Sequence, residues 1–477
     1  LDKRYVDKVN SEEIFEKSIG DMLHQLDPHS NYLSAKEMQS ARESMTGKFG
    51  GVGVRFYIIR DTVCITHVVP GSPSEKAGVL AGDKLISVDG EDVAGQSITN
   101  EDVMSYLKGT PDTKVKVKML RGTEEVQIEI VRGEIPRRSV TSAFLMDSET
   151  GFIRVEEFSE TTANEFKVAA LKLLQNGMKR LILDLRNNGG EAMVSAIEMA
   201  DEFLPSGMTI LQTKGANVRD EKFKSRGGGL LENIKVAVLI NQNSASASEI
   251  LAGALQDNDR AFVYGRRSFG KGLVQRDFFL RDSSNLRLTI SRYYTPSGRS
   301  IQRPYNGSME DYYGDAYDRF DNGELFAPDS SIFIDSLKYK TRKGRTVYGG
   351  GGINPDFFIP YDTTDFTDYF SKIRFSGALQ DFAFDYVSDK RDKWEDMQDY
   401  KTNFDVDTKM VRSFMRFAKG AHDVGYSSSD FTKNAKILAK YIKAEIARQL
   451  WIEEGYFFII NDHDSEIQSI LESNLDA

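Results

Sequence analysis

Three short segments of the chain hold residue types that hydrolytic chemistry uses. In the first, NQNSASASEILAGALQ at 241–256, three alternating serines follow an apolar run and precede a helical pattern. The serines are therefore predicted at a helix N-terminus, where backbone N–H groups and the helix dipole can stabilise an oxyanion. Serine is also a common helix N-cap, and the segment alone favours that structural role.

The second segment, SFGKGLVQ at 268–275, carries a candidate general base. Lys271 lies between two glycines before a predicted strand, and Gln275 follows at an even offset, which places both side chains on one strand face. A lysine between glycines can also be an ordinary surface turn residue. To act as a base it must be neutral, and burial lowers a lysine pKa enough to allow this. Ser–Lys dyads are a known variant of serine hydrolase chemistry.

The third segment, LDLRNNGGE at 183–191, is an apolar strand that ends in Gly189 and Gly190 before a predicted helix. In open α/β sheets, functional groups gather beyond such strand ends. The glycine pair forms either a simple tight turn or a turn that presents a backbone N–H to a substrate carbonyl.

Several other chemistries are excluded by what the sequence lacks. None of the five histidines lies in an HExxH motif, no GxSxG elbow is present, and no cluster has zinc spacing. His29 is predicted in a turn, so a Ser–His triad is disfavoured. The single cysteine, Cys64, excludes an internal disulfide. The acidic stretch 311–324 lacks EF-hand spacing and is predicted to be a solvated loop. We expect no metal and no cofactor.

Length and charge set further bounds. The 477 residues predict about three domains, and the net charge of −10 disfavours nucleic acid or an anionic membrane surface as a partner. No run of about 20 apolar residues is present, so no transmembrane segment is expected. The chain begins without Met and shows no signal peptide, which is typical of a processed or truncated form whose targeting segment lay upstream.

The periodicity of apolar residues changes along the chain. Residues 11–46 are predicted to be helical, and 47–135 form short β-rich runs with one helix near 100–109. Strands alternate with helices over about 150–300, which predicts an α/β layered domain. Residues 300–360 are predicted as loops and short strands, and the chain beyond 361 as helical, with Leu438, Ile442, Ile446 and Leu450 on one packing face.

Taken together, SASASE, FGKGLVQ and DLRNNGG resemble the protease core of the carboxy-terminal-processing, or tail-specific, protease family. LDPHSNYLSAKE and YYTPSGRSIQRPY are similar to that family too, so the resemblance covers about 20–360. It implies a multidomain α/β protein with a ClpP/crotonase-like protease core, an inserted β-rich PDZ domain and a helical C-terminal region. The expected segments are N-terminal helical 1–46, PDZ 47–135, protease core with cap 136–360, and C-terminal helical 361–477.

The resemblance also assigns roles to individual residues. The sequence alone does not rank Ser244, Ser246 and Ser248, but the family spacing of 25 residues to the lysine selects Ser246 as nucleophile. By the same resemblance, Lys271 is the base and Gln275 orients it. The oxyanion hole then takes the N–H of Ala247 and one from the glycine turn, for which Gly190 is the better match and Gly189 the alternative.

The segment 47–135 resembles a PDZ domain. Gly51, Val52, Gly53 and Val54 match its carboxylate-binding loop, in which backbone N–H groups hold the free C-terminus of a peptide that adds as an extra strand. Val52, Val54, Val103 and Leu107 either line an apolar pocket for the last peptide residue or belong to the core.

We therefore expect a serine endopeptidase that captures protein C-termini. The alternatives are a catalytically silent PDZ scaffold, disfavoured because Ser246, Lys271 and Gln275 are all intact, and a small-substrate acyl hydrolase, which would need no peptide groove. Expected partners are peptides with free C-termini, and an adaptor protein and a homo-oligomer are further candidates. By resemblance, the expected location is the bacterial cell envelope, in the periplasm.

Overall fold

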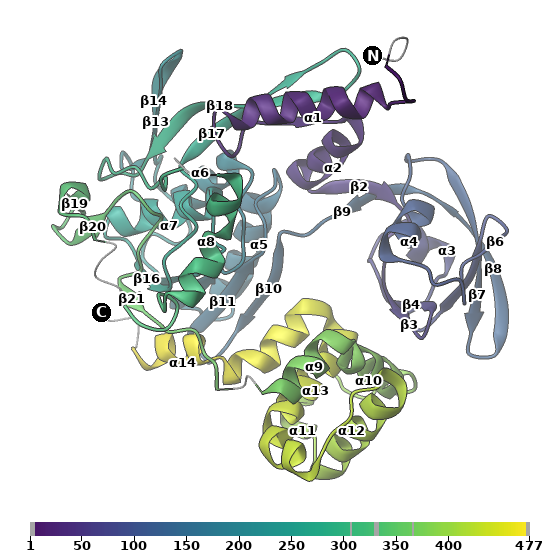
Figure 1. The fold of residues 1–477 in the computed structure, drawn as a ribbon. Helices are drawn as coiled ribbons and strands as arrows, with labels where there is room; N and C mark the ends of the chain where they lie inside the picture. The colour runs from purple at the N-terminus through teal and green to yellow at the C-terminus, as the bar shows by residue number, and fades with distance from the viewer. Residues whose placement is uncertain (1–4, 306–307, 329–332, 365–366, 474–477) are drawn as a thin grey trace. The chain divides into compact units, whose positions relative to one another are not determined.

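The structure, a computed structural model, describes residues 5–305, 308–328, 333–364 and 367–473 (Figure 1). The chain forms two compact units. The first combines 1–47, 138–361 and 469–477, and the second combines 48–137 with 362–468. The helical residues 362–468 thus belong to the same unit as the β-rich segment. The four-segment division remains a prediction, and its outermost residues, 1–4 and 474–477, lie outside the described residues.

The first unit is built on a sheet whose strands lie in the order β10-β11-β12-β15-β16-β21. All neighbouring pairs are parallel except β10 and β11. Burial on both faces explains why the central strands read as continuous apolar runs. The strands are β10 (Val140–Leu145), β11 (Thr150–Val155), β12 (Arg180–Asp184), β15 (Lys235–Ile240), β16 (Phe262–Gly265) and β21 (Phe357–Phe358). The predicted alternation of strands and helices is confirmed.

Three helices pack beside one another along this sheet: α5 (Thr162–Gln175), α6 (Met193–Asp201) and α7 (Ala247–Asp257). Apolar residues at helical spacing, such as Phe166, Ala170 and Leu173 in α5, face the core. Helix α7 is buried along its whole length. Its first turn therefore holds a fixed position in the middle of the unit.

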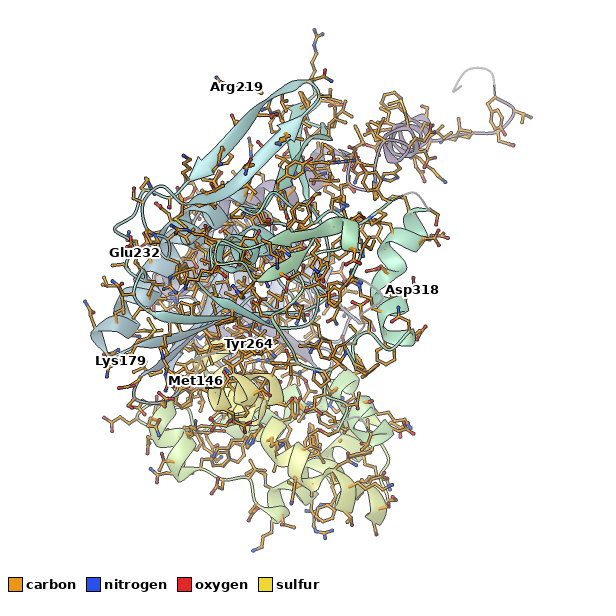
Figure 2. The ribbon with its side chains drawn as sticks, turned by 90° about the vertical axis from the view of Figure 1, so that its left-hand side faces the viewer. Met146, Lys179, Arg219, Glu232, Tyr264 and Asp318 are labelled. Atoms are coloured by element: carbon orange, nitrogen blue, oxygen red, sulfur yellow. The ribbon has the colours of Figure 1, made fainter. Side chains whose placement is uncertain are left out.

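A second sheet of the first unit has the strand order β1-β18-β13-β14, with β17 paired to β18. Its members are β1 (Asn31–Leu33), β13 (Thr209–Gly215), β14 (Val218–Lys224), β17 (Leu273–Phe279) and β18 (Asn285–Tyr294). The β13–β14 hairpin extends as a two-stranded ribbon with Arg219 at its tip (Figure 2). Because β1 lies between α1 (Ser11–His24) and α2 (Ala35–Thr46), its pairing with β18 attaches the N-terminal segment to the second sheet.

The prediction of loops and short strands over 300–360 is wrong in part. The acidic stretch predicted as a solvated loop forms helix α8 (Met309–Asp321), which Ser308 begins through a capping box. Tyr312 and Arg319 of this helix are buried, and Arg319 pairs with Asp315 one turn earlier. These packing contacts explain the helix where its acidic composition suggested solvent. The short strands β19 (Lys338–Lys340) and β20 (Thr346–Tyr348) follow.

The second unit contains the β-rich segment, whose sheet has the order β3-β4-β5-β7-β8, with β6 beside β5. Alternate residues of β3 (Val54–Ile59) and β4 (Thr62–Val68) point into its core, which helix α4 (Asn100–Leu107) closes. The other elements are β2 (Lys48–Gly51), α3 (Pro73–Ala77), β5 (Lys84–Val88), β6 (Glu91–Asp92), β7 (Lys114–Arg121), β8 (Glu124–Val131) and β9 (Gly133–Pro136).

The helical part of the second unit packs against the same sheet. Its predicted stripe is confirmed as a packing face, since Leu438, Ile442 and Ile446 are fully buried and Leu450 is half-buried. A small apolar cluster of Ile59, Cys64 and Phe384 joins the helices to the outer face of β3 and β4. The helices are α9 (Asp368–Ser376), α10 (Ala378–Val387), α11 (Met397–Asn403), α12 (Thr408–His422) and α13 (Ser428–Ile460). Helix α14 (Ser465–Glu472) begins in the second unit, which ends at residue 468. None of the described helices is long and apolar enough to cross a membrane.

Candidate active site

Ser246 occupies the sharp turn between β15 and α7. Its backbone has φ 54° and ψ −111°, a conformation that residues with a side chain rarely adopt. Such strain persists only where the surroundings enforce it, and it is frequent at active sites. The turn is held by Asn241, whose carbonyl accepts a hydrogen bond from the Ser244 N–H at 2.9 Å. The conformation is the kind that presents a nucleophile at the start of a helix.

The hydroxyl groups of the other two serines in the segment are hydrogen-bonded to backbone carbonyls. The hydroxyl of Ser244 donates to the Leu185 carbonyl at 2.8 Å, and that of Ser248 donates to the Asn188 carbonyl at 2.9 Å. Both side chains are fully buried. Ser246 is half-buried and lines a cavity of about 770 Å³ in the first unit. This geometry favours Ser246 among the three serines.

Lys271 and Gln275 line the same cavity. The Nζ of Lys271 donates to the Gln275 Oε1 at 3.0 Å, and the Gln275 Nε2 donates to the backbone carbonyl of His29. These two bonds fix which end of the amide faces the lysine. No hydrogen bond joins Lys271 to the Ser246 hydroxyl, although both residues are described. Catalytic contacts of this kind often tighten only when substrate binds.

The environment of Lys271 favours its neutral form. Burial lowers the pKa of its amine, and the nearby Arg287 guanidinium lowers it further, against opposing carboxylates that include Glu191 and Glu249. Arg287 is held by an ion pair with Asp277, with Nε and Oδ1 2.8 Å apart. A lysine with a lowered pKa can accept a proton near neutral pH, as a general base must.

Glu249, which the sequence analysis did not single out, connects the two predicted catalytic segments. Its buried carboxylate accepts hydrogen bonds from the Ser268 hydroxyl at 2.5 Å and from the backbone N–H groups of Gly270 at 2.7 Å, Lys271 at 2.9 Å and Ser246 at 2.8 Å. Burial outweighs these bonds and raises the pKa of the carboxyl to about 7. The signal available in the sequence was its place at the third position of a helix behind the serine run.

A second side chain outside the predicted set bridges the same two residues. The hydroxyl of Tyr293, at the end of β18, donates to the Lys271 carbonyl at 2.6 Å and lies 3.2 Å from the Ser246 carbonyl. Tyr293 belongs to the YYTPSGRSIQRPY segment, so its motif was recognised while its contact was not. Ser246 and Lys271 are thus linked through both their backbone N–H groups and their carbonyl groups.

The predicted oxyanion hole is formed only in part. No described residue accepts a hydrogen bond from the Ala247 N–H, although Ala247 is fully buried and does not line the cavity, so its role as an oxyanion donor stays a prediction. Gly190 lies directly against that N–H: a Cβ added there would be 2.6 Å from the Ala247 nitrogen and from the Ser246 Cβ. The Gly190 N–H, however, donates to the Asn188 Oδ1 at 2.9 Å. Gly189 is exposed in the same cavity, so the choice between the two glycines stays open.

The strand end that carries the glycine turn is fixed by a buried carboxylate. Burial would raise the pKa of Asp184, but the guanidinium groups of Arg186 and Arg154 outweigh it and hold that pKa at about 2. The Asp184 Oδ2 accepts from Arg154 at 2.7 Å and from Arg186 at 2.9 Å. The Asp-Leu-Arg part of the motif therefore has a structural role.

The N-terminal DPHS turn supports the lysine from the other side. The Asp27 Oδ1 accepts from the backbone N–H of His29 and of Ser30, both at 2.8 Å, and from the Thr289 hydroxyl of β18 at 3.0 Å. Burial and the charge of Lys271 lower the pKa of His29 to about 4, so its ring is neutral, and its Nε2 lies 2.9 Å from the Tyr312 hydroxyl. His29 thus acts through its carbonyl, in agreement with the predicted turn.

The predicted carboxylate-binding loop lies between β2 and β3. Gly53 has φ +83°, and a Cβ there would be 2.4 Å from that of Ser72, so the loop requires glycine. The Val52 carbonyl accepts from the Ser74 N–H at 2.9 Å. Val103 and Leu107 are buried in the core of the β-rich segment, which suits the core alternative. The ligand-binding role of the loop stays a prediction.

Across the described ranges, no three His, Cys, Asp or Glu side chains lie together as metal ligands would.

Comparison with known families assigns three stretches of the chain. Residues 149–312 match "Peptidase family S41", residues 64–121 match "PDZ domain", and residues 369–452 match a family of unknown function. The first two matches confirm the resemblance and the fold class. PDZ domains bind peptide C-termini by strand addition.

Curated relatives agree with this assignment. The chain is 38% identical over 306 residues to "Carboxy-terminal-processing protease" of Bartonella bacilliformis, a match that covers 63% of this chain and 69% of that protein. It is 34% identical over 303 residues to "Probable CtpA-like serine protease" of Staphylococcus haemolyticus. This match covers 63% of this chain and 60% of that protein, so the chain spans about three fifths of that relative. Among solved structures, "Photosystem II D1 C-terminal processing protease" matches with 28% identity, 62% and 80% coverage and a TM-score of 0.36.

Proposed function

Since this chain belongs to peptidase family S41 and is a carboxy-terminal-processing serine protease with a PDZ domain, we propose that Ser246 is its nucleophile and Lys271 its general base. The observation that carries this assignment is the placement of Ser246 and Lys271 in one cavity, linked by one carboxylate. Both residues line one cavity, and Glu249 binds the backbone N–H of each. A strained serine that shares a cavity with a half-buried lysine of lowered pKa is the arrangement that a Ser–Lys dyad needs.

The proposed reaction begins with neutral Lys271 taking the proton of the Ser246 hydroxyl as its Oγ attacks the carbonyl carbon of the scissile peptide bond. The Ala247 N–H and one N–H of the glycine turn stabilise the oxyanion. The protonated lysine then donates its proton to the departing amine, which leaves an acyl-enzyme. In the second half, Lys271 activates a water that releases the acyl group and restores the serine.

Gln275 holds Lys271 in place throughout this cycle. Its Oε1 accepts from the amine in both protonation states, and its Nε2 is fixed by the His29 carbonyl. The N-terminal segment therefore contributes a positioning contact to the proposed dyad.

Substrates enter this proposal as protein tails with a free C-terminus. Backbone N–H groups of Gly51–Val54 hold the terminal carboxylate, and the tail adds as a strand at the edge of β3. The proposal extends to the bacterial periplasm as location, export through a signal peptide, an adaptor protein and a homo-oligomer, for which the resemblance is the support. Osmotic-shock fractionation of the native host tests the location.

The test of the function compares the wild type with Ser246→Ala on an unstructured protein substrate, followed by gel electrophoresis. We expect wild-type cleavage and none by the variant. The same substrate with an amidated C-terminus should show a KM raised about tenfold, as for the loss of charge-assisted hydrogen bonds. A wild type that binds the tail without cutting it would instead identify a silent scaffold.

A further inference from the structure

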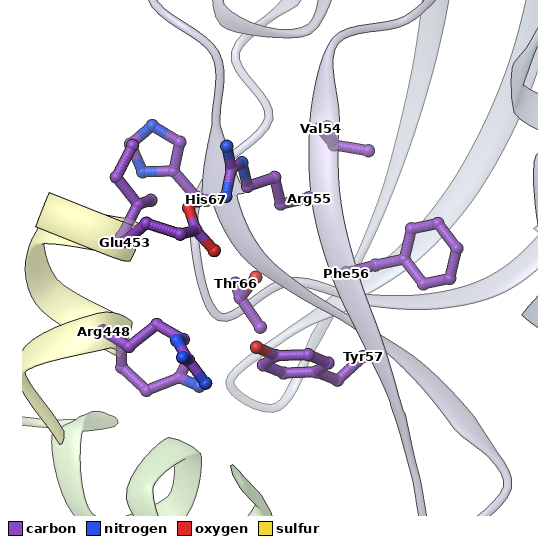
Figure 3. A pocket seen from close by; sticks show the side chains of 10 residues that line it. Val54, Arg55, Phe56, Tyr57, Thr66, His67, Arg448 and Glu453 are labelled. Atoms are coloured by element: carbon purple, nitrogen blue, oxygen red, sulfur yellow. Dashed lines mark hydrogen bonds and ion pairs between the residues drawn. The ribbon is translucent and has the colours of Figure 1, made fainter. Parts of the chain in front are cut away.

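The edge strand that would receive a substrate tail is covered on one face by the C-terminal helices. Strand β3 ends the sheet of the second unit, so one of its backbone edges has no neighbouring strand in that sheet. Val54, Phe56 and Ile58 pack on the core of the β-rich segment. Arg55 and Tyr57 therefore point to the opposite face, because side chains alternate along a strand. Figure 3 shows Val54 and Phe56 on one side of the strand and Arg55 and Tyr57 on the other.

The same alternation applies to a tail added beside β3. If its last residue points to the core face with Val54, the penultimate residue and the fourth from the end point to the face of Arg55 and Tyr57. A cavity of about 380 Å³ lies between the strands and α13. It is lined by residues 54–57 of β3, by Thr66 and His67 of β4, and by Arg448, Gln449, Ile452 and Glu453 of α13. Arg55 on the edge strand pairs with Glu453 of α13, so the helix reaches the strand that the tail would join.

The cavity contains a buried polar group without a partner. Gln449 is 3% exposed, and neither its Oε1 nor its Nε2 has a hydrogen-bond partner among the described residues. An unsatisfied buried amide costs free energy unless a ligand completes its bonds. The Arg448 Nη1 lies 2.7 Å from the Glu445 Oε1 and Arg55 pairs with Glu453, which leaves little net charge on the lining. The Arg448 Nε also has no hydrogen-bond partner among the described residues, so the lining offers this donor beside the Gln449 amide.

The backbone at this cavity is strained. Helix α13 breaks at Trp451 and Ile452, and Ile452 has φ 53° and ψ −149°, a region that β-branched residues avoid. The break lies between Gln449 and Glu453, so residues before and after it both line the cavity. In a continuous helix, the side chains after the break would point in other directions relative to Gln449. The strain is an independent indication that the wall has a specific shape.

We propose that helix α13 forms the second wall of the substrate groove and selects tails with an uncharged polar side chain, an amide above all, at the penultimate position. The inference rests on the proposed capture of C-termini by the β-rich segment. An Asn or Gln side chain in the cavity can donate to the Gln449 Oε1 and accept from its Nε2. The helical segment that matches a family of unknown function thereby acquires a role in specificity.

The test measures tail binding without cleavage. The full chain with Ser246→Ala is titrated with short N-terminally fluorescein-labelled peptides that share one apolar last residue and carry Asn or Leu before it, followed by fluorescence polarisation. We expect the Asn peptide to bind about tenfold more tightly, as for a buried amide pair satisfied rather than left open. Equal affinity, or a preference for Leu, overturns the inference, and this comparison needs no variant in the helix.

Variants then locate the preference. Gln449→Met, which keeps the size of the side chain, should remove the advantage of Asn and leave the Leu peptide within about twofold. Gln380→Met is the matched control, because Gln380 lies on α10, away from the cavity, and its Oε1 also lacks a partner among the described residues. An Asn preference that survives Gln449→Met contradicts the assignment. Peptides with an amidated C-terminus separate the two proposals. If they bind as well as free acids, the proposed capture of C-termini is wrong. If free acids bind better but show no preference for Asn, only the proposed role of α13 in specificity is wrong.

Discussion

The backbone N–H groups of Ser246 and Lys271 donate to one atom, the Oε2 of Glu249, at 2.8 and 2.9 Å. The other carboxylate oxygen takes the Ser268 hydroxyl and the Gly270 N–H. One side chain in the first turn of α7 therefore closes the loop at 268–271 onto the start of the helix. This carboxylate therefore holds the backbones of the proposed nucleophile and base together, and it accepts from neither the Ser246 hydroxyl nor the Lys271 amine.

The first prediction concerns the dyad. Ser246→Ala and Lys271→Met should each lower kcat by at least about a thousandfold, and the double variant should lose no more, because the two groups act as one unit. Initial rates on an unstructured protein substrate measure this. Ser244→Ala serves as control: its hydroxyl donates to the Leu185 carbonyl and accepts from the Asn241 N–H, so the variant should lower the melting temperature and keep kcat within about tenfold. If Ser244→Ala lost activity while Ser246→Ala retained it, the nucleophile would be Ser244 and not Ser246.

The glycine turn gives a second prediction with a matched pair. At Gly190 a Cβ would be 2.6 Å from the Ala245 oxygen and the Ala247 nitrogen, whereas at Gly189 nothing lies within 4 Å. Gly190→Ala should therefore displace the Ala247 donor and cut kcat by about a hundredfold or more, the usual cost of one lost oxyanion donor. Gly189→Ala should retain most activity. Similar rates for the two variants would show that close packing at Gly190 does not shape the oxyanion hole.

A third prediction uses the hydrogen bond between Lys271 and Gln275. Replacing Gln275 with Glu places a carboxylate about 3.0 Å from the amine, which favours the charged lysine and raises its pKa. Because the base must be neutral, the rise of kcat/KM with pH should move to higher pH, and activity at pH 7 should fall. Gln275→Ala should impair turnover without that shift towards alkaline pH. An unchanged pH profile in Gln275→Glu would argue against Lys271 as the base.

The sequence predicted the layers of the protease core because burial on both faces and helical periodicity leave direct marks on the residue pattern. It also placed Ser246, Lys271 and Gln275 in one site through their motifs, and the structure brings them to one cavity. Helix α8 was missed because its acidic, tyrosine-rich surface hides the buried Tyr312 and Arg319. Such burial depends on neighbours distant in the chain.

The contacts that hold the site together were out of reach for the same reason. The His29 carbonyl binds Gln275 across 246 residues, and a backbone carbonyl carries no signature of its own in the sequence. Tyr293 reaches Ser246 and Lys271 only because β18 pairs with β17. Pattern arguments identify the groups that react, whereas their supports depend on tertiary structure.

The last prediction follows from the raised pKa of Glu249. Its four hydrogen bonds all come from donors, so a proton on the carboxyl displaces at least one of them and loosens the contact to Ser246 or to the lysine loop. As pH falls through about 7, the carboxyl is protonated and activity should fall with it. In Glu249→Gln the amide NH₂ group would face two of the hydrogen-bond donors that now bind the carboxylate, so kcat should fall about tenfold or more. The fall of activity at acid pH in this variant should then reflect only the protonation of Lys271.

The free energy of unfolding should depend on pH in the direction opposite to activity: as pH falls, Glu249 should lower activity but raise stability. This difference distinguishes the ionisation of Glu249 from that of Lys271. A folded-state pKa above the unfolded value means that the native state binds the proton more tightly. The contribution of Glu249 to the free energy of unfolding is therefore fully present below the unfolded pKa near 4.5 and is lost as pH rises through about 7. The difference in unfolding free energy between wild type and Glu249→Gln, measured in urea from pH 5 to 8, should shift against the wild type as pH rises. A difference that is constant over this range would show that Glu249 keeps an ordinary pKa, and the fall of activity below pH 7 would then belong to Lys271 alone.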